Sequence, residues 1–141
     1  MALVVPDEGE VELLKKLLIN TSDSENYLLK LYTNDPTLGN ATTLADFVEA
    51  TFTNYAEKTL VRGASGNCWS TPTTNGTNKA ESGATIQSWT CGATGQTIIG
   101  YYVIGSSSTK VLWAEKFSSA RALVNGDILN LTPAFTLNSA N

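Results

Sequence analysis

The sequence contains no histidine and only two cysteines among its 141 residues. The absence of histidine excludes Ser-His-Asp triads, Cys-His dyads and almost every zinc or non-haem iron site. The two cysteines, Cys68 and Cys91, are too few for a disulfide framework or a zinc site. They could form one disulfide if their strands are neighbours, or remain two buried thiols that pack as small hydrophobic side chains, which we favour.

Basic residues are also scarce: the sequence has nine Lys and Arg residues but thirteen Asp and Glu residues, and its net charge is −4. Nucleic-acid binding needs clustered Lys and Arg, so we expect no nucleic-acid partner. No apolar run approaches the roughly 20 residues of a membrane-spanning helix, and the first residues lack the basic and long apolar regions of a secretory signal. There is no Walker-type phosphate loop and no GxGxxG motif. We therefore expect no membrane, no cofactor and no metal.

The strongest structural signal is the stretch Thr97–Phe117. Two apolar runs, Ile98–Ile104 and Val111–Phe117, flank the turn Gly105–Thr109, which predicts a β-hairpin. Neither face of the first run is polar, so we expect this strand in mid-sheet with both faces covered.

Residues 1–24 are predicted to form an N-terminal arm and helix. Met1–Pro6 is a short apolar strand or arm, and helical spacing runs over Glu8–Ile19 with Asp7 as the expected N-cap. Glu12 and Lys16 stand at i,i+4, where they can pair. The apolar stripe of this helix comprises Val11, Leu14, Leu17 and Leu18, and Leu13 broadens it. It must be covered by the sheet of the same chain, which we favour, or by another subunit.

Residues 25–137 are predicted to form a β-rich body in the same single domain. Ser118–Val124 is interpreted as a connection, and Asn75–Gly76 and Asn125–Asp127 as turns. Further strands are expected at Asn26–Tyr32, Asn54–Arg62, Cys68–Ser70, Thr85–Thr90, Ile128–Thr132 and Ala134–Leu137. The fold class is mainly β: an antiparallel β-sandwich or partial barrel with one N-terminal amphipathic helix.

Glu115 is the charged member of an otherwise hydrophobic strand face that also carries Trp113 and Phe117. Such a carboxylate is either a catalytic acid with a raised pKa or half of an ion pair with a basic residue such as Arg121, in the same chain or in a neighbouring subunit. We favour the ion pair, because no second catalytic group lies nearby in sequence, and we predict no catalytic residue. Trp69 could stack on a sugar, but packing in a core or interface is favoured for all three tryptophans.

Four segments together resemble small virion structural proteins of tailed bacteriophages. They are Leu44–Leu60, Ile98–Ile104, Val111–Phe117 and Val124–Leu137, and the range from Leu44 to Leu137 in which they lie covers about two-thirds of the chain. Their order matches an "ADF-EA-F-GY-A--L" segment, a "-YGYYV" strand, an "LLWAE-F" strand and an "NGD-L-L-P" close. The sequence departs from this pattern in the excursion Cys68–Gly83 and at Asn54, where glycine is usual.

The resemblance implies a non-enzymatic component of the virion. The expected role is a capsid decoration (cement) protein, a homotrimer on the capsid surface that binds the major capsid protein of the same phage after synthesis in the host cytoplasm. The arm and helix then supply the candidate capsid or inter-subunit contacts: Leu3, Val4, Val5, Val11, Leu14 and Leu18. Two alternatives remain. One is a tail, baseplate or host-recognition module whose loops, such as Ser65–Gly83, touch a surface glycan; the other is a carbohydrate-active enzyme.

Overall fold

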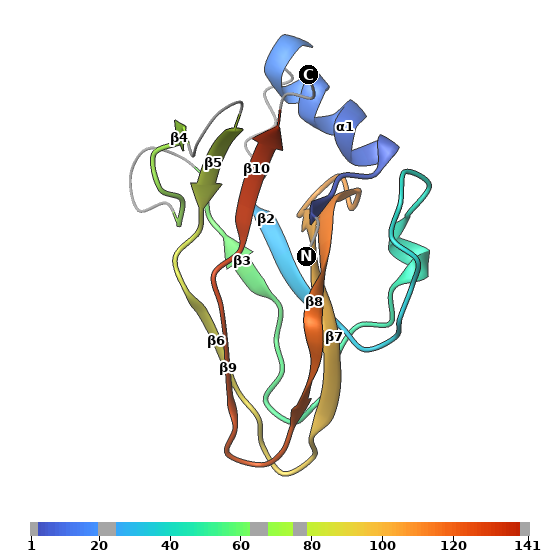
Figure 1. Cartoon of the computed structure of the whole chain (residues 1–141), viewed down its shortest axis with the longest axis vertical. Coiled ribbons are helices and arrows are strands. Elements are labelled where there is room, and N and C mark those ends of the chain that lie inside the picture. Colours follow the sequence, from blue (N-terminus) through green and yellow to red (C-terminus); the bar gives the residue numbers. More distant parts are fainter. Residues whose placement is uncertain (1–2, 20–24, 63–67, 75–78, 139–141) are drawn as a thin grey trace.

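The computed structural model describes residues 3–19, 25–62, 68–74 and 79–138. Figure 1 shows a β-rich body with the helix α1 (Asp7–Leu14) lying across one end. All strand pairs in the named sheets are antiparallel. The predicted fold class, mainly β with antiparallel sheets and one N-terminal helix, is confirmed.

The strands of the described residues form three sheets. The largest has five strands in the order β1 (Leu3–Val4), β8 (Val111–Leu123), β7 (Gln96–Gly105), β2 (Tyr27–Tyr32) and β3 (Lys58–Leu60). A three-stranded sheet has the order β10 (Ala134–Asn138), β5 (Lys79–Gly83) and β4 (Thr73–Thr74). A two-stranded sheet pairs β6 (Gln87–Thr90) with β9 (Ile128–Leu131).

The predicted hairpin forms the centre of the largest sheet, as β7 and β8. Strand β8 continues to Leu123, so the prediction of a connection at Ser118–Val124 is wrong. Its far end pairs with β7 through Ala122 and Leu123, which extends the ladder beyond the apolar run. The turn predicted at Asn125–Asp127 is confirmed, and its glycine, Gly126, has a φ of +92°. The turn predicted at Asn75–Gly76 lies outside the described residues.

Both faces of β7 are buried, as predicted. On one face Tyr101 and Val103 join the main core, to which Trp89 of β6 and Leu129 of β9 also belong. On the other face Tyr102 joins a smaller core with Phe47, whose ring stacks on Tyr102 at 4.4 Å between centroids. The second face is therefore covered by the loop after β2, which includes a short 3₁₀ turn, η2 (Leu44–Asp46).

The strand predicted over Asn54–Arg62 is confirmed only at Lys58–Leu60. Asn54 itself has a φ of +73°, in the left-handed region where glycine is favoured and asparagine is tolerated. The local backbone thus gives a physical reason for a glycine or an asparagine at this position.

This conformation gives a first prediction. Asn54→Ala is expected to lower the free energy of unfolding by about 1 kcal/mol, because a left-handed conformation costs an ordinary L-residue about 1–2 kcal/mol. Asn54→Gly is expected to preserve stability. Urea denaturation of both variants measures the difference; equal stabilities for the alanine and glycine variants would contradict the backbone explanation.

Candidate functional site

Helix α1 begins directly after Pro6 and continues as a π-helical segment, η1 (Lys15–Ile19). The prediction of Asp7 as N-cap is wrong: Pro6 occupies that position and makes no side-chain cap, while the Asp7 N–H donates to the Asn40 carbonyl at 2.9 Å. Acidic residues fill the first turn, where they complement the helix dipole.

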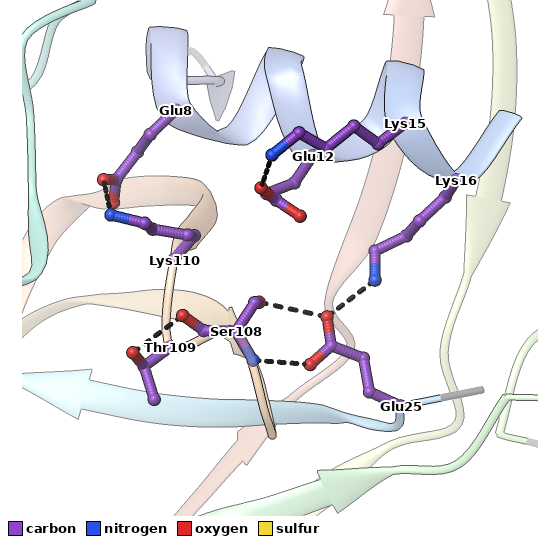
Figure 2. A network of polar contacts seen from close by, with 8 residues as sticks. All are labelled: Glu8, Glu12, Lys15, Lys16, Glu25, Ser108, Thr109 and Lys110. Atoms are coloured by element: carbon purple, nitrogen blue, oxygen red, sulfur yellow. Dashed lines mark hydrogen bonds and ion pairs between the residues drawn. The ribbon is translucent and has the colours of Figure 1, made fainter. Parts of the chain in front are cut away.

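The first turn of the helix packs on the start of β8 through the polar contacts of Glu8 and through the backbone of Gly9, which closely approaches the strand. The Glu8 carboxylate accepts a hydrogen bond from the Val111 N–H at 2.9 Å and lies 3.3 Å from the Lys110 ammonium. Figure 2 shows Glu8 and Lys110 facing each other below the helix. Gly9 sits so close to the strand that a Cβ there would lie 2.5 Å from the Leu112 carbonyl oxygen. The helix side that faces β8 is therefore not its apolar side.

A buried carboxylate, Glu25, fixes the other end of the helix. The Lys16 ammonium lies 2.6 Å from Glu25 Oε1, and the Glu25 side chain is 0% exposed. The backbone N–H groups of Ser107 and Ser108 donate to Oε2 at 2.7 and 2.9 Å, and the Ser108 hydroxyl donates to Oε1. Figure 2 shows Lys16 reaching from the helix to this carboxylate. Glu25 thus connects the helix to the β7–β8 loop.

These contacts explain an unusual pKa for Glu25. Burial alone would raise the pKa, but the ion pair with Lys16 and the hydrogen bonds from Ser107 and Ser108 outweigh burial and lower it to about 2. The expected Glu12–Lys16 pair does not form: Glu12 binds Lys15 at 2.8 Å, and Lys16 extends to Glu25 instead. The change coincides with the π-helical turn, in which i,i+4 side chains no longer align.

Leu13 is partly buried beside the body, but the other large apolar side chains of the helix are exposed. Their exposed fractions range from 50 to 76%, and they are Val11, Leu14, Leu17, Leu18 and Ile19. We call these five residues the apolar helix face. The expectation that the sheet of the same chain covers the stripe is wrong for these residues. Gly9 is the one sequence signal for this arrangement, since a glycine inside a helix costs stability and indicates close backbone approach.

The N-terminal arm is bound within its own chain. Leu3 and Val4 form β1 and pair with Glu115 and Ala114 of β8. Leu3 and Val5 pack against the main core, and all three arm residues are partly buried. Of the six predicted contact residues, the structure therefore leaves Val11, Leu14 and Leu18 exposed on the helix and places the three arm residues against the body.

An aromatic pocket of about 260 Å³ lies beside the helix, and Leu13 forms part of its wall. The rings of Tyr27, Trp69 and Phe135 surround Trp113 at centroid distances of 5.8, 5.9 and 5.0 Å. The buried indole N–H groups of Trp69 and Trp113 have no hydrogen-bond partner in the described part of the chain. Trp69, considered above as a sugar platform, packs against the core, as do Trp89 and Trp113.

Both cysteines are free thiols in the structure; Cys91 is buried, as favoured above, whereas Cys68 is only partly buried. Cys91 is buried in the main core. The Cys68 sulfur is partly buried and accepts a hydrogen bond from the Val61 N–H at 3.3 Å. Each cysteine is therefore accommodated by its own local packing.

The predicted Glu115–Arg121 ion pair does not form within the chain. Glu115 lies directly opposite Tyr101 in the β7–β8 register, and the Tyr101 hydroxyl donates to Glu115 Oε2 at 2.6 Å. Burial, and then this hydrogen bond to an anion, raise the pKa of Tyr101, so the hydroxyl keeps its proton and acts as the donor. Glu115 and Arg121 nevertheless line the same cleft.

Over the described ranges, no three Asp, Glu or Cys side chains gather in a way that could hold a metal ion, and no helix is long and apolar enough to cross a membrane. Compared with known proteins, the chain matches no family model and no curated sequence. The apolar helix face, with the aromatic pocket beside it, is accordingly identified from geometry alone as the candidate functional site.

Proposed function

We propose that the chain is a non-enzymatic structural protein of a tailed-bacteriophage virion, a capsid decoration protein that docks on the major capsid shell through the apolar helix face. The observation that carries the proposal is a helix fastened to the body by its polar side, with five large apolar side chains turned outward. Large apolar side chains that are exposed together on one helix are typical of protein-interaction sites.

The attachment of the helix is important because a docking surface binds best when it is preorganised. Glu8, Gly9 and the Lys16–Glu25 pair fix the helix relative to the β7–β8 hairpin before any partner arrives. Burial of a large apolar side chain contributes roughly 1.5–3 kcal/mol, so a few of these side chains can anchor an interface. The aromatic pocket beside Leu13 offers a recess for a side chain of the partner.

The assignment to a virion is supported by the four-segment resemblance. The left-handed backbone at Asn54 is compatible with this resemblance, because the phage pattern usually has a glycine at this position and glycine favours such a backbone. We also propose that the protein acts as a homotrimer on the capsid surface and is assembled in the host cytoplasm. Sedimentation equilibrium of the free chain, whose monomer mass is 15.0 kDa, measures its oligomeric state.

The proposal is tested by mixing the purified chain with shells assembled from the major capsid protein of the same phage. Saturable co-sedimentation with shells is expected. A chain that stays in the supernatant and instead binds host cells or a glycan array would contradict the decoration role and favour a tail, baseplate or host-recognition module.

A further inference from the structure

A second candidate site lies away from the helix, in a cleft of about 350 Å³ between β8 and the segment that includes β9 and leads into β10. Figure 1 shows that these segments belong to different sheets of the body. The buried ring of Tyr101 belongs to the cleft, and the polar side chains that line it are Glu115, Ser118, Arg121, Asn130 and Thr132. None of these polar groups is part of the apolar helix face.

A bulge in β8 shapes one wall of the cleft. The register pairs Gly100 with Lys116 and Ile98 with Arg121. Between these two pairs β7 advances by two residues while β8 advances by five, so β8 bulges out of the ladder. Bulges of this kind are frequent beside binding sites, because they redirect side chains out of the regular ladder. Here Glu115 and Phe117 line the cleft near the start of the bulge, and Arg121 lines it at the end.

The two opposite charges of the cleft do not form an ion pair with each other. Glu115 Oε2 is occupied by the Tyr101 hydroxyl, which fixes the orientation of the carboxylate. Over the described residues, Glu115 makes no ion pair, and the exposed Arg121 makes none either. An acceptor and a multiple donor therefore remain available to a ligand in the same cleft.

The opposite wall adds further hydrogen-bonding groups. Asn130 Oδ1 accepts from the Ser88 hydroxyl at 2.6 Å, which leaves the Asn130 amide N–H groups as donors. Thr132 adds a hydroxyl, and the partly buried Phe117 adds an aromatic surface. The cleft thus contains hydrogen-bond acceptors, hydrogen-bond donors and an aromatic surface.

We propose that this cleft binds a saccharide unit. A sugar presents hydroxyls that both donate and accept, together with an apolar C–H face. Its hydroxyls would donate to Glu115 and accept from Arg121 and Asn130, while the apolar face packs on Phe117. Among the described residues that line the cleft, Glu115 is the only carboxylate, and glycoside hydrolysis ordinarily requires two. The site therefore binds a sugar without cleaving it.

The test is titration of the full-length chain with a panel of neutral hexoses and N-acetylhexosamines. Saturation-transfer NMR detects binding, and calorimetry measures the dissociation constant. Binding of at least one sugar is expected, with a dissociation constant of about 1 mM. Glu115→Gln and Arg121→Ala are each expected to weaken it at least about 10-fold, the change that corresponds to loss of one good polar contact. Arg121 is exposed, so its alanine variant should keep its fold.

Lys116→Ala is the matched control. Lys116 neighbours Glu115 on β8 but extends to Asp35, 2.6 Å away, and does not line this cleft. This variant should bind the sugar as the unaltered chain does. The proposal is overturned if no sugar of the panel binds, if the Glu115 and Arg121 variants bind as tightly as the control, or if only zwitterions such as free amino acids bind. Shell binding through the helix is independent of each of these results.

Discussion

Replacing Glu25 by alanine is expected to lower the free energy of unfolding by about 3–5 kcal/mol, the usual cost of removing one partner from a buried ion pair. The substitution deprives the Lys16 ammonium and the N–H groups of Ser107 and Ser108 of a shared acceptor. Burying such groups without an acceptor costs far more than losing an exposed contact. Urea denaturation followed by tryptophan fluorescence measures the change.

Glu12→Ala is the matched control for this prediction. Glu12 pairs with Lys15 at 2.8 Å, a distance close to that of the Lys16–Glu25 pair, but the Lys15 side chain is well exposed. Pairs of this kind contribute about 0–1 kcal/mol. A Glu25→Ala variant no less stable than the Glu12→Ala variant would contradict the role assigned to the buried carboxylate.

The same carboxylate predicts a dependence of stability on pH. Its pKa is about 2 in the folded chain and 4.5 as the ordinary value, so the unfolded chain binds the extra proton first as the pH falls. The contribution of Glu25 is therefore complete above about pH 4.5 and is lost as the pH falls towards 2. It amounts to about 3 kcal/mol at 1.36 kcal/mol per pKa unit. Glu25→Gln should flatten the fall in unfolding free energy between pH 5 and pH 2; an unchanged slope would contradict the pKa assignment.

Changing Leu14, Leu17 and Leu18 together to glutamine is expected to weaken binding to capsid shells at least about 100-fold. Truncation of central interface residues commonly costs 2 kcal/mol or more each, and these side chains dominate the proposed contact. The helix itself should persist, because glutamine and leucine have similar helix propensities and the three side chains are exposed. Co-sedimentation measures binding, and circular dichroism with thermal unfolding verifies the fold.

Three apolar residues elsewhere provide the control for that variant. Ile86, Val124 and Ile128 have exposed fractions of 60 to 63%, comparable to those on the helix, but they lie on the β body. Changing all three to glutamine should leave shell binding within about 2-fold of the unaltered chain, because substitutions at exposed positions outside an interface have small effects. Equal loss of binding in both triple variants would show that general hydrophobicity, and not the apolar helix face, determines docking.

The sequence predicted the β body well where the pattern is local. The alternation of β2, the Thr97–Phe117 hairpin and the Asn125–Asp127 turn each depend on neighbouring residues, and each was confirmed. The end of β8 was missed because Ser118–Leu123 has no apolar run. Its strand conformation comes from pairing with β7 across the bulge, which no local pattern encodes.

The candidate sites depend on contacts between residues far apart in the chain, which explains why sequence reasoning reached them only in part. Periodicity correctly located the apolar stripe but could not show which side of the helix faces the body. That is decided by Glu8 with Lys110, and by Lys16 with Glu25 and the Ser107–Ser108 loop. Glu115 was recognised as unusual from its neighbours, yet its partner, Tyr101, follows only from the strand register.

The most direct test of the decoration role is the copy number and location of this chain in purified phage particles. Quantitative mass spectrometry against the major capsid protein gives the copy number, and antibody labelling in electron micrographs gives the location. The account predicts hundreds of copies per particle, distributed over the capsid surface. Absence from the particle, or a few copies confined to the tail, would contradict it.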